Sequence, residues 1–199
     1  MASPTTLRTI MGLASTLPSL GDSALVMIDL QNTYREGMMQ LAGVEPALAE
    51  AKILLERARA AGSLVIHIRH EAGAGSPYDT AARIGQISDE VAPRGGEAVI
   101  TKSYPDAFVG TDLEEMLRAA GRTDVVLAGF MTHMCINSTA RGAFNRGFRP
   151  VVVTSTTATR DLPGPDGAVV PAAAIQAASL GGLADLFAVL APRASDLPS

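Results

Sequence analysis

Short runs of apolar, often β-branched residues alternate along the chain with longer segments of helical periodicity. The apolar runs predict strands at 24–29, 63–69, 97–101, 124–128 and 150–154. The apolar spacing of the intervening segments predicts helices at 44–61, 111–120, 134–146 and 167–180. The pattern over 183–190 fits either a last strand or a helix.

The strands are apolar almost throughout, which is typical of a parallel sheet buried on both faces. Alternating strands and helices with right-handed crossovers then predict an α/β fold: a doubly wound, mainly parallel sheet of about six strands with helices on both faces, a Rossmann-like three-layer arrangement. With 199 residues, 47% of them hydrophobic, the chain suits one domain. We expect that domain over 23–199, after an N-terminal arm over 1–22 that lacks the apolar core and cleavage pattern of a signal peptide.

Charge and composition exclude several classes of partner. The formal net charge of -4 provides no basic field for nucleic acid or an anionic membrane surface. No apolar stretch approaches the roughly 18 residues that span a bilayer. The single cysteine leaves no internal disulfide. These features predict a cytoplasmic protein that acts on a small molecule.

Three chemically active side chains follow predicted strands. Asp29 closes the first strand, Lys102 follows the third and Cys135 follows the fourth. Taken one at a time, each has an ordinary structural explanation, as a cap, a solvated cation and a buried thiol. Ligands of doubly wound folds bind at the carboxyl ends of the strands, so the topology predicts that these three meet there. A thiol in the first turn of a helix and beside a lysine is expected to have a lowered pKa.

The surrounding motifs resemble the isochorismatase-like superfamily of cysteine hydrolases over nearly the whole chain. They are ALVMIDLQN with Asp29, TKSYPDAFVGTDLEEML with Lys102, and GFMTHMCINSTARGAFNRGF with Cys135. The resemblance implies an Asp-Lys-Cys triad and a cis peptide between Phe130 and Met131. It also implies an oxyanion hole made by the backbone N–H groups of Met131 and Cys135.

Departures from the superfamily narrow the expected chemistry. The nicotinamidase branch has an Asp-x-His metal motif after its second strand, whereas this chain reads HIRHEAGAGSPYD. His67 and His70 are three residues apart on a predicted strand and would point to opposite faces, so no metal or other cofactor is expected. Members that cleave the vinyl ether of isochorismate typically lack the cysteine, which favours amide chemistry. Ser155 stands where many relatives have an aspartate.

We therefore predict a cysteine-dependent hydrolase that cleaves a C–N bond of a small amide, carbamoyl, lactam or imide compound through a thioester. The alternatives are a vinyl ether hydrolase of the isochorismatase type and a non-catalytic α/β domain that binds ligands or senses redox state. Residues 70–96 form a long Gly- and Pro-rich crossover, with a helix expected over 79–91, and are predicted to cover or shape the pocket. The predicted substrate contacts are Gln31, Tyr34, Tyr104, Phe108, Phe130 and His133.

A homo-oligomer, either a dimer or a tetramer, is also expected. Met38, Met39 and Leu41 and the alanine-rich segment 168–180 carry more apolar surface than one packed helix face needs.

Overall fold

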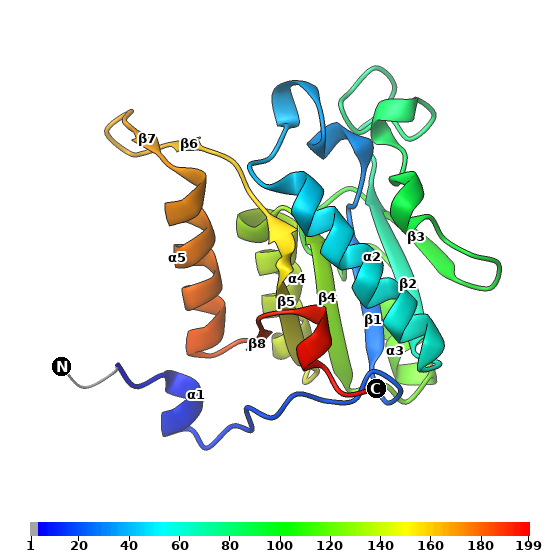
Figure 1. The fold of residues 1–199 in the computed structure, drawn as a ribbon, viewed down its shortest axis with the longest axis vertical. Coiled ribbons are helices and arrows are strands. Elements are labelled where there is room, and N and C mark those ends of the chain that lie inside the picture. The colour runs from blue at the N-terminus through cyan, green and yellow to red at the C-terminus, as the bar shows by residue number, and fades with distance from the viewer. Residues whose placement is uncertain (1–3) are drawn as a thin grey trace.

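A six-stranded parallel sheet forms the centre of the molecule in the computed structural model, which describes residues 4–199 (Figure 1). The strand order is β3-β2-β1-β4-β5-β8, and every neighbouring pair is parallel. The strands are β1 (Ala24–Ile28), β2 (Leu64–His70), β3 (Ala98–Lys102), β4 (Asp124–Phe130), β5 (Arg149–Ala158) and β8 (Val189–Ala191). This arrangement confirms the predicted doubly wound α/β fold.

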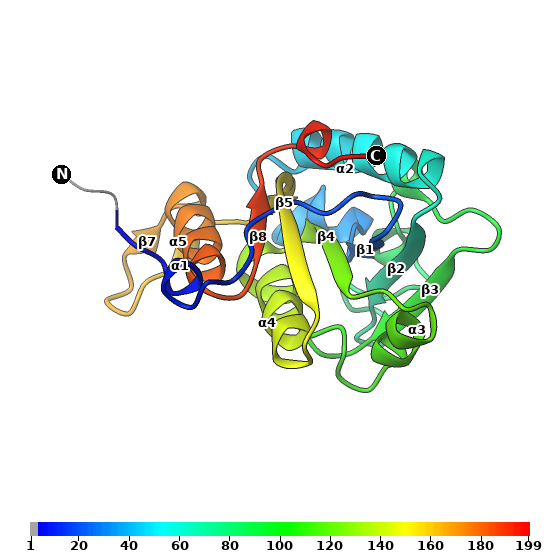
Figure 2. The same cartoon turned by 90° about the horizontal axis from the view of Figure 1, so that it is seen from below.

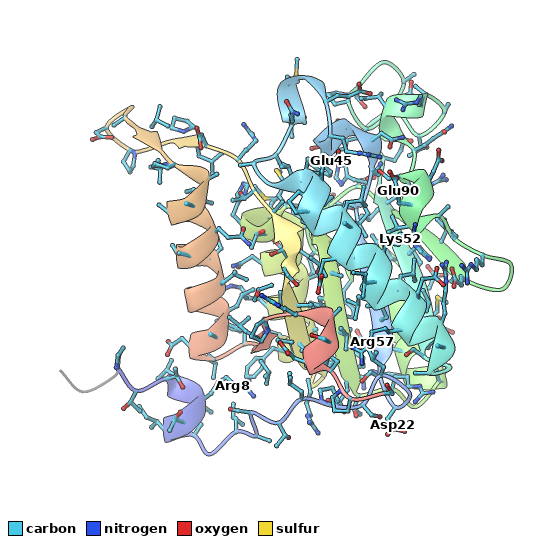
Figure 3. The ribbon with its side chains drawn as sticks, viewed as in Figure 1. Arg8, Asp22, Glu45, Lys52, Arg57 and Glu90 are labelled. Atoms are coloured by element: carbon cyan, nitrogen blue, oxygen red, sulfur yellow. The ribbon has the colours of Figure 1, made fainter. Side chains whose placement is uncertain are left out.

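Helices cover both faces of the sheet. They are α1 (Leu7–Ile10), α2 (Val44–Ala60), α3 (Leu113–Ala119), α4 (Asn137–Asn145) and α5 (Ala172–Asp185). Alternate residues of β1 point to opposite faces: Leu25 and Met27 join the core beneath α2, whereas Val26 and Ile28 join the core beneath α3 and α4. Figure 2 shows these two layers, with α5 beyond the β8 edge. Glu45 and Lys52 lie on the exposed side of α2, away from the sheet (Figure 3).

Two predicted helices are corrected by the structure. No helix spans 79–91; that segment contains only the 3₁₀ turns Arg83–Gly85 and Asp89–Val91. The reason is tertiary pairing, because the backbone around Ile87 bridges to Gln31 and cannot close helical hydrogen bonds. The helix expected over 134–146 begins instead as a π-helical turn, Thr132–Ile136, and continues as α4.

The C-terminal region also differs from the prediction. The helix expected from residue 167 starts at Ala172, because Val169–Val170 (β7) pairs antiparallel with Leu162–Pro163 (β6) in a small hairpin. That helix continues to Asp185, so the ambiguous segment 183–190 begins as the last turn of α5 and ends in the edge strand β8. Among residues 4–199, no helix combines the length and apolarity needed to cross a membrane.

The carboxyl ends of β1 and β4 lie side by side at the topological switch point, where the strand order reverses. From β1 the chain continues to β2 on one side, and from β4 it continues to β5 on the other. Gly129 allows the close approach of the two strands: its φ is +129°, and a Cβ there would lie 1.9 Å from the carbonyl oxygen of Ile28. Doubly wound folds bind their ligands in such a crevice.

Candidate active site

Asp29, Lys102 and Cys135 lie together at this switch point. The Lys102 Nζ is 2.7 Å from Asp29 Oδ2 and 3.3 Å from Cys135 Sγ. The three residues are almost completely buried, with exposed fractions of 0%, 2% and 4%. Residues from three separate strand ends therefore form one contiguous group of carboxylate, cation and thiol.

The backbone at Asp29 aims its carboxylate into the crevice. Among residues 4–199 it is the only non-glycine residue with a positive φ, at 50°, a conformation that side chains other than Gly, Asn and Asp rarely adopt. Its backbone N–H donates to the carbonyl of Ile68 and so anchors the turn to β2. No N–H or O–H group of the described chain donates a hydrogen bond to Asp29 Oδ1, although that atom is buried. Burial raises the pKa of Asp29, and Lys102 opposes this increase.

Lys102 remains a cation in this group. Burial lowers its pKa, but the interactions with Asp29 and Cys135 more than compensate, so the pKa of Lys102 is raised. Its Nζ also lies 3.3 Å from Nδ1 of His70. Burial, together with the charge of Lys102, lowers the pKa of His70, so the neutral ring is favoured and Nδ1 can accept a hydrogen bond from the ammonium group.

The contact of His70 with Lys102 was not expected from the sequence, which suggested only a possible metal ligand at this histidine. The contact follows from the register of the parallel strands, because His70 ends β2 directly opposite Lys102 on β3. A single sequence does not show which residues of two strands lie opposite each other.

Cys135 is presented by the turn that follows β4. The peptide between Phe130 and Met131 is cis, as the resemblance implies. The carbonyl of Met131 accepts hydrogen bonds from the backbone N–H groups of Met134 and Ile136, at 3.0 and 3.2 Å, and this closes the π-helical turn. Cys135 is the fourth residue of the turn, within the stretch whose N–H groups have no partner earlier in the helix.

The expected lowering of the Cys135 pKa is wrong for this structure. Burial raises the pKa of the thiol, the negative charge of Asp29 raises it further, and Lys102 only partly opposes them. The cost of placing a thiolate in a buried site beside a carboxylate exceeds the benefit from the lysine. The resting group is therefore a neutral thiol next to an Asp29–Lys102 ion pair.

Aromatic rings enclose the triad. Tyr34, at the end of the turn after β1, packs edge to face against both Phe130 and Tyr78, with ring centroids 5.8 and 5.9 Å apart. Tyr78 also packs against His70 at 4.8 Å. It comes from the long crossover between β2 and β3, so this crossover shapes the site, in agreement with its predicted position. Its opening as a lid stays a prediction.

Two of the predicted substrate contacts are hydrogen-bonded within the protein. The Gln31 side chain accepts from the backbone N–H of His70 and donates to the carbonyls of His70 and Gly85. Its polar atoms thus tie the end of β2 to the crossover. His133 is two residues before Cys135, and its Nδ1 is 2.5 Å from the hydroxyl oxygen of Thr159.

The remaining predicted contacts lie at different depths. Tyr34 and Phe130 are 1% exposed and line the wall around the triad. Phe108 is buried in the core on the α3 and α4 side, where its ring stacks on Phe148. Tyr104 is 59% exposed, so it can contact substrate only at the rim of the site.

The two strand histidines do not converge on a common ligand. His67 is buried and its Nε2 lies 2.9 Å from Glu97, whereas His70 faces Lys102. Over residues 4–199, His, Cys, Asp and Glu side chains form no group of three or more that could hold a metal ion.

Comparison with known proteins connects this geometry to a family. Residues 23–194 match the isochorismatase domain, which includes all three residues of the buried group. The chain belongs to the isochorismatase family. It is 37% identical to the secreted isochorismatase effector Isc1 of Verticillium dahliae, over 92% of this chain and 94% of the relative.

Two further relatives have names that describe hydrolysis. The chain is 32% identical to a streptothricin hydrolase of Streptomyces noursei, over 88% of this chain and 70% of the relative. It is 35% identical to the maleamate amidohydrolase of Pseudomonas putida, over 65% of this chain and 69% of the relative.

Solved structures agree with this assignment. The crystal structure of an isochorismatase from Pseudomonas putida KT2440 superposes with a TM-score of 0.94 at 37% identity, covering 98% of this chain and 100% of that one. The cytoplasmic location expected from the sequence stays a prediction, because the Verticillium relative is secreted.

Proposed function

We propose that this isochorismatase-family hydrolase cleaves the C–N bond of a small amide or carbamoyl compound, with Cys135 as nucleophile and a thioester as intermediate. Relatives named maleamate amidohydrolase and streptothricin hydrolase support hydrolysis of this class. The observation that carries the proposal is the contact of Lys102 Nζ with both Asp29 and Cys135 inside a closed site. A nucleophile, a base and a fixed cation are thereby within reach of one carbonyl.

The first half of the reaction transfers the acyl group to sulfur. Because the thiol of Cys135 is neutral at rest, its proton passes to Asp29 as sulfur attacks the carbonyl carbon. The resulting oxyanion would be stabilised by the backbone N–H groups of Met131 and Cys135. When the C–N bond breaks, Asp29 returns the proton to the leaving nitrogen, which departs as ammonia or an amine.

The second half hydrolyses the thioester. Asp29 accepts a proton from water, and the oxygen attacks the thioester carbonyl. The same N–H groups stabilise the second oxyanion. The C–S bond then breaks, Asp29 returns the proton to sulfur, and the carboxylic acid leaves. The raised pKa of Asp29 suits a group that must both accept and return a proton.

Lys102 stabilises negative charge as it moves between Asp29 and Cys135. When Asp29 becomes protonated, the thiolate 3.3 Å away becomes the anion that pairs with the ammonium group. Its raised pKa keeps Lys102 charged throughout this exchange. The total charge of the group is unchanged by proton transfer, which avoids creating an unpaired ion in a buried site.

Intact mass spectrometry after mixing with a panel of small amides tests the proposal. Cys135 is the only cysteine in the chain, so one acyl group added per protein and mapped to this residue identifies both nucleophile and substrate. Turnover of an amide with no adduct under acid quench, and with no dependence on Cys135, would contradict the thioester route.

A vinyl ether substrate is the second candidate, since the Verticillium relative is named an isochorismatase effector. Cleavage of a vinyl ether needs a proton donor but no covalent nucleophile. Incubation of the wild type and Cys135→Ala with isochorismate separates the two candidates, because only vinyl ether chemistry survives loss of the thiol.

Activity is expected to be independent of divalent metal ions. The proposed triad provides nucleophile, base and cation, and His67 is engaged by Glu97 away from the site. Prolonged treatment with EDTA should leave kcat unchanged, whereas added zinc should inhibit if it captures the thiolate. Loss of activity on chelation that one equivalent of a metal restores would contradict this expectation.

We propose that the protein is a homo-oligomer, either a dimer or a tetramer. Of the apolar residues that motivated this expectation, Leu41 is buried and Met38 is 83% exposed. Helix α5 buries only Ala172 and Leu183, and its other apolar side chains are exposed or partly exposed. Light scattering at micromolar concentration should give a multiple of the chain mass of 20.6 kDa. A monomer would contradict the proposal. Ala178→Glu, which places a charge on the exposed side of α5, should favour dissociation.

A further inference from the structure

His70 lies at the end of β2, and both its backbone and its ring are fixed by neighbouring side chains. Its backbone N–H donates to Gln31 Oε1 at 2.9 Å, and its carbonyl accepts from Gln31 Nε2 at 3.0 Å. The imidazole packs edge to face against Tyr78, with ring centroids 4.8 Å apart. Held in this way, the ring has its Nδ1 3.3 Å from Lys102 Nζ.

The ammonium group of Lys102 has three acceptor atoms close to it. Its Nζ is 2.7 Å from Asp29 Oδ2, and it is 3.3 Å from both Cys135 Sγ and His70 Nδ1. An ammonium group carries three N–H donors and no acceptor, so one donor is available for each of these atoms. The first two acceptors belong to the proposed nucleophile and base, whereas the proposed chemistry has so far given His70 no part.

The contact with Lys102 determines which ring nitrogen of His70 carries the proton. Nδ1 can accept from the ammonium group only while it is unprotonated, so the neutral ring carries its proton on Nε2. Burial lowers the pKa of His70 and the charge of Lys102 lowers it further, while the charges of Asp29 and Glu71 oppose this. Tyr78, which packs against the ring, is an uncharged phenol whose pKa is raised by burial. A neutral ring therefore faces Lys102 at neutral pH.

We propose that His70 is a positioning residue, whose neutral imidazole holds the Lys102 ammonium group in place between Asp29 and Cys135 during the reaction. This rests on the proposed hydrolysis at Cys135. In that reaction a proton passes from the thiol to Asp29, so these two acceptors exchange their charges, whereas His70 stays neutral. A lysine has a flexible four-carbon stem, so an ammonium group attracted only by partners of changing charge would move with them. The contact with Nδ1 keeps it within reach of both.

Kinetics of two isosteric substitutions at His70 test this role, with an amide identified by its acyl adduct. Asparagine carries Oδ1 as many bonds from the backbone as Nδ1 of histidine, so His70→Asn keeps an acceptor for Lys102. Leucine has nearly the same shape but no acceptor, so His70→Leu leaves a donor of a buried cation without a partner. His70→Leu should lower kcat about ten- to a hundredfold and change KM by less than about twofold. His70→Asn should keep kcat within about threefold of the wild type.

His67→Gln is the matched control. His67 lies on the same strand, but its Nε2 contacts Glu97 instead of the triad. Glutamine can place its amide nitrogen at a similar distance from the backbone, so kcat should be unchanged. Equal losses of kcat in His70→Leu and His70→Asn would show that only packing of the ring matters, and would overturn the assignment. Wild-type kcat in His70→Leu would overturn it as well.

Alkylation of Cys135 by iodoacetamide needs no turnover, and so separates this proposal from the proposed hydrolysis. Lys102 lowers the pKa of the thiol, so a displaced ammonium group would stabilise the thiolate less. His70→Leu should therefore need a higher pH for alkylation, and His70→Asn should not. An unchanged pH profile in His70→Leu overturns the role of His70 even if amides are hydrolysed. A shifted profile without turnover of any amide supports the role and counts against the proposed hydrolysis.

The position of the proton on His70 can be measured in the wild type, so this test does not depend on the folding of His70→Leu. The chain has three histidines, and the ring signals of His70 are those lost in His70→Asn. Long-range ¹H–¹⁵N NMR at neutral pH should show Nδ1 unprotonated and Nε2 protonated. In Lys102→Met the pKa of His70 should rise, because the charge that lowers it is removed. A proton on Nδ1 in the wild type at neutral pH would overturn the proposal.

Discussion

Replacing Cys135 with alanine is expected to abolish amide hydrolysis while leaving the protein folded. The substitution removes the only thiol, and with it the covalent route, so kcat should fall on the order of a millionfold. The fold should tolerate it, because alanine suits a helical turn and Cys135 contributes only a small buried side chain to the core beneath α4. Steady-state kinetics together with circular dichroism of the purified variant provide the measurement.

The control for this experiment is the melting temperature, which should change little if only the nucleophile is lost. Wild-type protein alkylated at Cys135 should be equally inactive, which tests the same residue without mutation. An alanine variant with kcat within tenfold of the wild type would remove Cys135 as nucleophile. Retained cleavage of isochorismate with no amide turnover would instead favour vinyl ether chemistry.

Replacing Lys102 with methionine is expected to cause the largest loss of stability of any change in the site. It leaves Asp29 without its partner 2.7 Å away, at a position that is 0% exposed. Breaking a buried ion pair from one side typically costs about 3 to 5 kcal/mol in the free energy of unfolding. Urea denaturation at several pH values measures this cost.

The loss should grow as the pH rises. Without Lys102, burial raises the pKa of Asp29 still further above its ordinary value of 3.8, and the folded state binds the proton more tightly than the unfolded state. Stability of the variant is therefore greatest below the unfolded pKa of Asp29 and decreases as the pH rises toward the folded pKa. In the double variant Lys102→Met/Asp29→Asn no buried charge remains, and most of the lost stability should return.

A surface pair provides the control. Arg83 and Glu36 are 77% and 58% exposed at their side chains, so Arg83→Met should cost less than about 1 kcal/mol. A similarly small cost for Lys102→Met at neutral pH, with no dependence on pH, would contradict the buried ion pair.

The same Lys102 variant should need a higher pH for alkylation of Cys135. The reason is that Lys102 lowers the pKa of the thiol, whereas burial and Asp29 raise it.

The alternation of apolar strands and amphipathic helices determined the fold class, because each strand of a parallel sheet is buried on both faces and carries that signature locally. The motifs around Asp29, Lys102 and Cys135 identified the candidate triad, and strand-end positions in a doubly wound topology explain why residues so distant in sequence meet. The segment over 79–91 could not be predicted in the same way. Its backbone is held by Gln31 and Asn32 across the crevice, which overrides a local helical pattern.

Only the tertiary structure decided the electrostatics of the site. The sequence placed Cys135 at a helix start beside a lysine and so indicated a lowered thiol pKa; burial and the charge of Asp29 reverse that direction. It also could not show that His70 contacts Lys102. Desolvation and ion pairing depend on which groups surround a side chain in space. A single sequence shows directly only which residues are neighbours along the chain.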